Sequence, residues 1–273
     1  MFEHMAKFIP LHVMKLPQGN DSAQDQAYWL ESVKELVRVL EQTFQVQISN
    51  EKLSTAIKEL NDERKLIMEL ADFMKYDPAP ISGQDMLKVL WARNFVFDRP
   101  EFAQQVRDLI SELKERVARG EGALAKGAKR IVVTGVPTGL GAEKVLKIIE
   151  ENGGALVYIE NCAGMKQFVN PVEEAKPALE AIAEKYLNTH CSCMSPNPRR
   201  LEIVEKICRD FKADGVVDIV WQGCHTYNVE SKILQDYLKE KNGIPFLQIE
   251  TDYSQGDAEQ IRTRVQAFME RMP

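Results

Sequence analysis

The stretch Lys129–Gly141, KRIVVTGVPTGLG, decides the fold of this chain. Its apolar, β-branched run Ile131-Val132-Val133 indicates a strand that is buried on both faces. The run breaks into the glycine-bearing turn Gly135–Gly141, and a helical pattern of apolar residues starts at Ala142. A strand, a glycine turn and a helix N-terminus form a βα unit, whose turn can point backbone N–H groups at a ligand.

The sequence after this stretch repeats the same strand-and-helix rhythm. Further strands are expected over residues 155–159, 215–221 and 245–249, with helices over 171–187, 199–211, 228–241 and 257–269. Because crossovers between parallel strands are right-handed and must cover a face, the pattern predicts an α/β fold. We expect residues 127–273 to form a flavodoxin- or Rossmann-like domain with a doubly wound, four-stranded parallel sheet in the order 2-1-3-4.

The first half of the chain has a different, helical pattern. Helices are expected over 23–45, 51–75, from Ser82 to Trp91 and from Pro100, so residues 20–126 are predicted to be a helical domain. Ahead of it, the alternation in Phe8–Leu16, FIPLHVMKL, predicts a strand. Nothing nearby in the sequence offers that strand a partner, and isolated strands are not stable.

Composition narrows the class of protein. The chain has 273 residues, 44% of them hydrophobic, and a net charge of −6, which argues against nucleic acid and anionic membranes as partners. Its N-terminus lacks the basic-then-apolar layout of a signal peptide, so a cytoplasmic protein is expected. Five cysteines, an odd number, indicate metal ligation or redox chemistry and not a disulfide framework.

Four of the cysteines fall where a doubly wound sheet binds ligands, beyond the carboxyl ends of its strands. Cys162 follows the second strand, Cys224 follows the third, and the excursion between these strands carries Cys191 and Cys193. Thiolates are the ligands of iron–sulfur clusters and zinc. Ligation by Cys162, Cys191 and Cys224 is therefore weighed above the alternative, which is that they are small buried hydrophobic residues.

The spacing refines this ligand set. Cys191 and Cys193 are too close together for a zinc knuckle, so one of the two is expected to be a bystander, and Cys208 on a helix is expected to be core. Two inter-strand spacings place the Cys162 and Cys224 loops about 10 Å apart, on either side of the first strand. The thiols should then converge on one open cleft beside the glycine turn.

Other candidate site residues lie along the same rim. Gly135, Thr138, Gly139 and Gly141 could bind a cofactor or another anion, or could only reverse the chain. The turn lacks the third glycine of a dinucleotide fingerprint, and no phosphate-binding Lys-Ser or Lys-Thr pair follows it.

His225 and Glu250 are candidates for catalytic acid–base work, with helix capping and other structural roles as the alternative.

Several motifs occur in a distinctive order along the whole chain. They are HVMKLP, GVPTGLGAEKV, IENCAG, KYLNTHCSCMSPNPRR, DGVVDIVWQGCHTYNVES and IPFLQIETDYS. With these motifs the chain resembles the 2-hydroxyacyl-CoA dehydratase and benzoyl-CoA reductase family, and within it the double-cubane-cluster proteins.

The resemblance implies an oxygen-sensitive, anaerobic iron–sulfur protein, acting as a reductase or a lyase. Electrons would come from a separate ATP-hydrolysing activator protein that carries its own iron–sulfur cluster. The cluster, a double cubane or [4Fe–4S], would lie between two similar α/β domains. Its ligands here would be Cys162, Cys191 and Cys224, with Cys193 as the alternative to Cys191.

The resemblance also implies that something is missing. Similar proteins carry another α/β domain ahead of Phe8–Leu16, so residues 1–19 are expected to be the remnant strand of an absent N-terminal domain. Catalysis would then need a homodimer or a complementing subunit. Two other functions remain open: a non-catalytic scaffold with vestigial cysteines, and a flavodoxin-like binder of small ligands at Gly135–Gly141.

Overall fold

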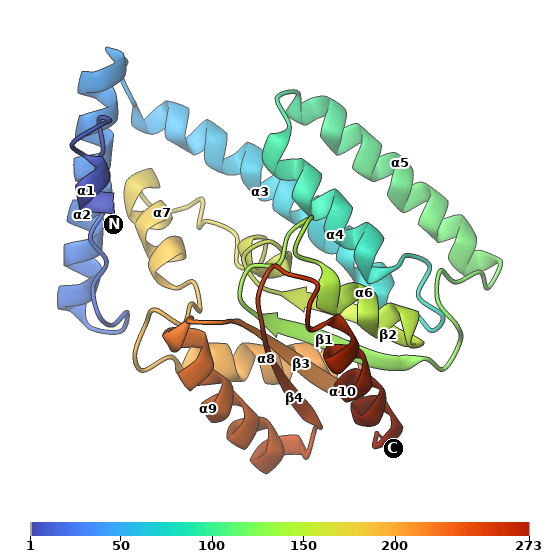
Figure 1. The fold of residues 1–273 in the computed structure, drawn as a ribbon. Helices are drawn as coiled ribbons and strands as arrows, with labels where there is room; N and C mark the ends of the chain where they lie inside the picture. The colour runs from blue at the N-terminus through green and yellow to red at the C-terminus, as the bar shows by residue number, and fades with distance from the viewer. Residues whose placement is uncertain (1, 273) are drawn as a thin grey trace. The chain divides into compact units, whose positions relative to one another are not determined.

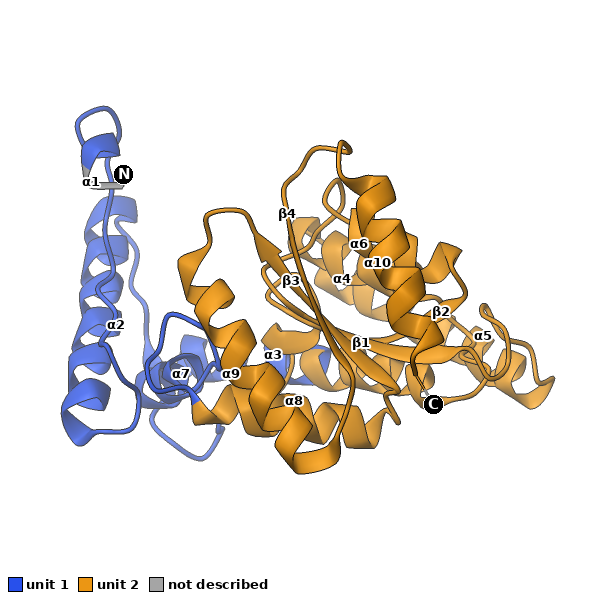
Figure 2. Ribbon diagram, turned by 60° about the horizontal axis from the view of Figure 1, so that its bottom comes forward, with its two compact units in different colours: residues 1–63, 170–197 blue, residues 64–169, 198–273 orange. Residues whose placement is uncertain are grey.

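The computed structural model describes residues 2–272, with Phe2 and Glu3 as backbone only. The chain forms two compact units, residues 1–63 with 170–197 (unit 1) and residues 64–169 with 198–273 (unit 2), coloured separately in Figure 2. The boundary at residues 63 and 64 falls inside one helix, α3 (Asn50–Asp72), and so cuts across the predicted helical block. Within residues 2–272 every helix is too short or too polar to cross a membrane.

Unit 2 is built on a four-stranded parallel sheet (Figure 1). Its strands are β1 (Lys129–Gly135), β2 (Gly154–Glu160), β3 (Gly215–Trp221) and β4 (Phe246–Thr251), in the order β2-β1-β3-β4. The predicted order 2-1-3-4 is confirmed. In the register, Thr134 of β1 lies opposite Glu160 of β2 and Asp218 of β3, so the carboxyl ends of these three strands meet at one rim.

Helices cover both faces of this sheet, which makes it doubly wound. Ile131 and Val133 pack with residues of α6 (Lys144–Glu151) and α10 (Ala258–Glu270), whereas Val132 packs with residues of α8 (Pro198–Asp210) and α9 (His225–Asn242). This alternation follows from the two-residue period of a strand. The apolar cluster around Val132 also contains residues of α3, α4 (Gly83–Ala92) and α5 (Arg99–Ala118).

Serine side chains cap two helices of the N-terminal half. Ser82 accepts a hydrogen bond from the backbone N–H of Asp85 (3.0 Å) and starts α4. Ser22 does the same for Asp25 (3.0 Å) at the start of α2 (Ala23–Phe44). Each hydroxyl satisfies one of the N–H groups that a helix leaves without an internal partner.

Unit 1 pairs α2 with α7 (Ala178–Leu187). The indole of Trp29 is buried between them and donates to the carbonyl of Ala183 (3.0 Å). Val33, Leu187 and Met194 complete the same apolar cluster. A short helix, α1 (Phe2–Met5), lies at the N-terminus.

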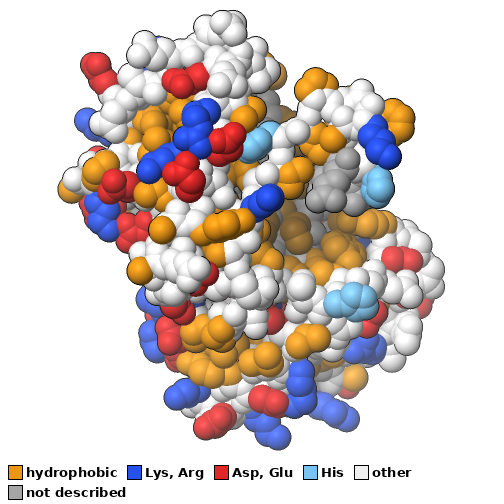
Figure 3. Space-filling model, turned by 90° about the vertical axis from the view of Figure 1, so that its left-hand side faces the viewer, with side chains coloured by type: hydrophobic (Ala, Val, Ile, Leu, Met, Phe, Trp, Pro, Cys, Tyr) orange, Lys and Arg blue, Asp and Glu red, His pale blue; other side chains and the backbone are white. Residues whose placement is uncertain are grey.

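The strand predicted over Phe8–Leu16 is wrong. The segment has no regular secondary structure and belongs to no sheet; it lies along α2, where Ser32 donates to the carbonyl of Lys15 (3.2 Å) and Met14 packs against the Trp29 cluster. Alternation alone cannot make a strand, because a strand needs a neighbour for its backbone hydrogen bonds. Phe8 is 86% exposed. On the face of the molecule drawn in Figure 3, hydrophobic side chains lie at the surface among charged ones.

The helix predicted over residues 171–187 starts seven residues late, at Ala178. The side chain of Asn61 replaces the missing helical hydrogen bonds: its amide donates to the carbonyl of Val172 (2.8 Å) and its oxygen accepts from the Val172 N–H (3.0 Å). Pro177 then precedes the first residue of the helix, a position that proline tolerates because it lacks an N–H.

Replacing Gly135 by alanine should destabilise the protein more than replacing Gly141. Both glycines have positive φ (+107° and +91°), but a Cβ on Gly135 would lie 2.1 Å from the backbone oxygen of Ile219, whereas nothing lies within 4 Å at Gly141. Strained backbone alone costs about 1–3 kcal/mol, so G141A measures that cost and G135A adds the overlap. Urea unfolding of both variants tests this, and equal losses would contradict it.

Candidate functional site

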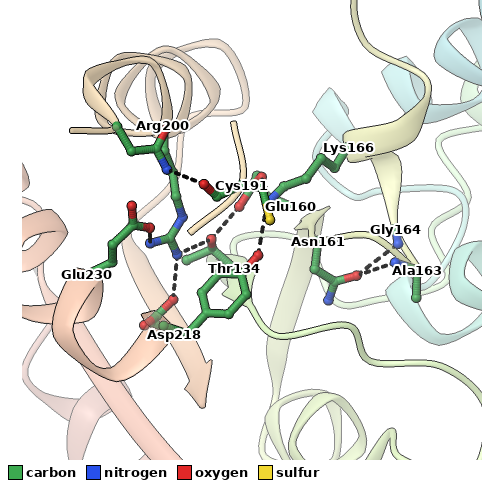
Figure 4. A network of polar contacts seen from close by, with 12 residues as sticks. Thr134, Glu160, Asn161, Ala163, Gly164, Lys166, Cys191, Arg200, Asp218 and Glu230 are labelled. Atoms are coloured by element: carbon green, nitrogen blue, oxygen red, sulfur yellow. Dashed lines mark hydrogen bonds and ion pairs between the residues drawn. The ribbon is translucent and has the colours of Figure 1, made fainter. Parts of the chain in front are cut away.

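The loop after β2 is a tight turn that carries Cys162 at its exposed tip. The side-chain oxygen of Asn161 accepts hydrogen bonds from the N–H groups of Ala163 (3.0 Å) and Gly164 (2.9 Å), as Figure 4 shows. Gly164 is required here, because a Cβ would lie 2.2 Å from the carbonyl oxygen of Ile159. Asn161 is fully buried while Cys162 is exposed, so the turn fixes the thiol at the rim of the sheet.

The loop after β3 places a second thiol at the same rim. Gly223, with φ of +85°, turns the chain so that the Cys224 N–H donates to the carbonyl of Trp221 (2.8 Å). Cys224 is half-buried and is the N-cap residue of α9. A helix N-terminus favours a negative charge placed next to it.

Between these two loops lies a buried ionic network. The ammonium of Lys166 contacts the carboxylate of Glu160 (3.0 Å), and both side chains are 1% exposed. The same ammonium donates to the hydroxyl of Tyr227 (3.3 Å), in the first turn of α9, and Glu160 also accepts a short hydrogen bond from Thr134 of β1. Desolvation alone would lower the pKa of Lys166, but Glu160 raises it, so the side chain stays charged.

Arg200 extends this network from α8 across the sheet. Its guanidinium is fully buried and contacts Asp218 of β3 (3.1 Å), Glu230 of α9 (2.7 Å) and the hydroxyl of Thr134 (3.2 Å) (Figure 4). Burial works against the charge, and the carboxylates around it outweigh burial and raise the pKa of Arg200. The network therefore joins β1, β2, β3, α8 and α9 directly beneath the rim.

A signal for part of this network was present in the sequence. Asp218 interrupts the apolar run Gly215–Trp221, and a charged residue inside a buried strand requires a buried partner. Lys166 gave no such signal, because it lies in a short 3₁₀ helix, η3 (Met165–Gln167), outside the predicted strands and helices.

The protein's own side chains and backbone pack against the glycine turn between β1 and α6. Gly139 fits against the ring of Trp91, where a Cβ would lie 2.1 Å away. The Gly141 N–H donates to the carboxylate of Glu143, and the buried Thr138 hydroxyl donates to the carbonyl of Val136 (3.1 Å). With Gly135 pressed against β3, these contacts account for the turn as a chain reversal, and a cofactor role for it remains a prediction.

His225 and Glu250 are both exposed at the ends of neighbouring strands. His225 is the first residue of α9, and Glu250 of β4 lies opposite Val220 in the register. Glu250 accepts a hydrogen bond from the amide of Asn228 (3.2 Å), which ties it to α9. Their acid–base role remains a prediction.

Cys191 and Cys193 belong to unit 1. The Cys191 carbonyl accepts from the Met194 N–H (3.1 Å) and from the Asn197 side chain (3.0 Å), leaving Cys191 half-buried and Cys193 exposed. Among residues 2–272, no group of three or more His, Cys, Asp or Glu side chains is placed to hold a metal ion. The rim of unit 2 thus offers two thiols, and the third ligand remains a prediction.

Comparison with known proteins assigns the family. The family model of the 2-hydroxyglutaryl-CoA dehydratase D-component matches residues 1–272. The chain belongs to this family.

Its relatives are dehydratase subunits that are longer than the matched region. The "Putative dehydratase subunit YjiM" of Escherichia coli K12 is 38% identical over the whole chain and 70% of its own length. The (R)-phenyllactyl-CoA dehydratase beta subunit of Clostridium sporogenes is 27% identical over 97% of the chain and 68% of its own length. The beta subunit of (R)-2-hydroxyglutaryl-CoA dehydratase from Acidaminococcus fermentans is 23% identical over 97% of the chain and 69% of its own length.

The five thiols should differ sharply in reactivity in the metal-free protein. Cys162 and Cys193 are exposed, whereas Cys208 is 1% exposed and burial raises the pKa of its thiol to about 12. Because the thiolate is the reacting form, iodoacetamide in mildly alkaline, anaerobic buffer should modify Cys162 and Cys193 first. Cys208 should react only after denaturation. Peptide mass spectrometry over time measures this order, and early modification of Cys208 would contradict it.

Proposed function

We propose that this chain is the iron–sulfur subunit of an ATP-dependent, low-potential 2-hydroxyacyl-CoA dehydratase-like system. The observation that carries the proposal is the position of two thiols, the exposed Cys162 and the half-buried Cys224, in the loops that follow the strands on either side of β1. The family match along residues 1–272 supports the reaction class. As in the sequence analysis, Cys191 is the third ligand in this proposal, with Cys193 as its alternative.

The residues of the rim suit a thiolate-ligated cluster. Cys162 is held at the tip of a rigid turn and Cys224 at a helix N-terminus, where a negative charge is favoured. The buried cation of Lys166 lies in the same loop as Cys162, and the Cys162 thiol is among the groups that act on its pKa. A bound cluster would supply single-electron transfer at low potential. His225 and Glu250 would move protons at the exposed side of the rim.

The proposal includes partners. An ATP-hydrolysing activator protein with its own iron–sulfur cluster would deliver the electrons in the cytoplasm of an anaerobic cell. The remaining ligands would come from a complementing subunit or from a second copy of this chain. Two relatives support a pairing of similar chains: the alpha and beta subunits of (R)-2-hydroxyglutaryl-CoA dehydratase both match this chain, at 24% and 23% identity.

The alternative is a non-catalytic subunit with vestigial cysteines. It is favoured by one observation, the absence of a three-ligand group among residues 2–272. The flavodoxin-like ligand binder is less favoured, because the glycine turn is filled by contacts with Trp91, Glu143 and Ile219.

Anaerobic reconstitution with iron and sulfide tests the proposal. The protein should turn brown, bind iron and sulfide in equal amounts and give an electron paramagnetic resonance (EPR) signal on reduction. Cys162→Ser and Cys224→Ser should each lose most of the iron, because each removes a thiolate ligand. Cys191→Ser and Cys193→Ser identify the third ligand, since only one of them should have this effect.

The control for these variants is Cys208→Ala, which removes a buried thiol away from the rim and should keep the iron of the unmodified protein. Circular dichroism establishes that each variant is folded. A protein that folds stably but binds no iron, either alone or with a complementing subunit, would leave the non-catalytic alternative.

A further inference from the structure

The loops that carry Cys162 and Cys224 are connected by one buried side chain. Lys166 lies four residues after Cys162, and its ammonium contacts Glu160 at the end of β2 (3.0 Å). It also reaches the hydroxyl of Tyr227 (3.3 Å), three residues after Cys224. The ammonium thus bridges residues from the two sides of β1, because β1 lies between β2 and β3, from which these loops emerge.

Burying the charge of Lys166 costs free energy that its pairing with Glu160 only offsets, so the charge suggests a role beyond stability. Lysine is rarely found fully buried, and a buried ion pair is often no more stabilising than apolar side chains of the same size. Lys166 is nevertheless 3% exposed as a whole residue, and it lies 5.7 Å from the centroid of the Tyr227 ring. Arg200 approaches the same ring at 5.0 Å, so two cations fix the first turn of α9.

We propose that Lys166 is a positioning residue that holds the Cys162 loop and the first turn of α9 at one fixed separation. It also holds one positive charge between the two cysteine loops. The inference rests on the proposed function, because the fixed separation matters only if both thiols ligate one group. Without the tether, each thiol would still lie at the rim, but the two loops would move independently.

The ammonium has a second consequence for any anionic group bound by these thiols. Reduction of a thiolate-ligated cluster adds negative charge, and a buried cation stabilises the reduced form more than the oxidised form. Removing the cation should therefore shift the midpoint potential to a more negative value. A purely structural lysine would affect folding without this shift.

The first measurement uses the metal-free protein. Nitroxide spin labels are attached to Cys162 and Cys224 in a chain with Cys191→Ser, Cys193→Ser and Cys208→Ala, and dipolar broadening of the EPR spectrum reports their separation. The variant is Lys166→Met with Glu160→Gln, which removes both charges and so avoids a buried, unpaired carboxylate. We expect a narrow distance distribution in the parent protein and a clearly broader one in the variant.

The matched control is Lys144→Met with Asp257→Asn. This pair is also a buried lysine with an aspartate in unit 2, but it joins the start of α6 to the segment between β4 and α10, and neither side chain bonds the Cys162 loop or the first turn of α9. The control should keep the narrow distribution. Tyr227→Phe removes only the hydroxyl that Lys166 reaches, and it should broaden the distribution less than the double variant does.

The second measurement is the midpoint potential of the reconstituted protein, followed by EPR during a redox titration. Lys166→Met should shift it to a more negative value, and Lys166→Arg, which restores the charge, should bring it back toward the parent value. An unchanged distance distribution in a folded double variant would overturn the proposal. A parent protein that binds no cluster, either alone or with a complementing subunit, would refute the proposed function, while the spin-label result would still decide whether Lys166 holds the two loops.

Discussion

The ion pair between Arg200 and Asp218 is the interaction on which the rim of the sheet depends. Both side chains are fully excluded from solvent, and the guanidinium also reaches Thr134 and Glu230. Breaking a buried pair of this kind costs about 3–5 kcal/mol, because the remaining charge has no water to solvate it. The pair therefore sets where α8 and α9 lie against β1 and β3. The cysteine loop after β3 takes its position from that arrangement.

Most of the sheet could be predicted because its strands are short apolar runs. Residues 215–221 were predicted as a strand with the same bounds that the structure gives β3, and the order of the strands followed from the pattern of doubly wound sheets. Two predictions failed for one common reason: the structure of each segment depends on which group, distant in sequence, bonds its backbone. Phe8–Leu16 alternates like a strand but has no neighbouring strand, and residues 171–177 are kept out of a helix by the side chain of Asn61. Neither effect can be seen in a local window of sequence.

The position of two of the candidate cysteines could be predicted from the sheet, whereas their role as ligands stays a prediction. The rule that ligands bind at the carboxyl ends of parallel strands places Cys162 and Cys224 at one rim, where Cys162 is exposed and Cys224 is half-buried. The predicted binding of a cofactor by the glycine turn has less support, since packing already accounts for its glycines. Gly135 and Gly139 leave room for Ile219 and Trp91, so a glycine pattern typical of anion sites can also arise from close packing.

The charges that sequence reasoning missed explain how the rim keeps its shape. Loops after parallel strands have no ladder of hydrogen bonds, so side chains must hold them. Asn161 does so within the loop after β2, and Lys166 does so between that loop and α9. A polar network with defined geometry can hold two loops in one arrangement, whereas apolar contacts alone permit sliding. If Cys162 and Cys224 bind one group, as proposed here, their separation must be fixed, and buried charges can fix loops that no strand or long helix holds in place.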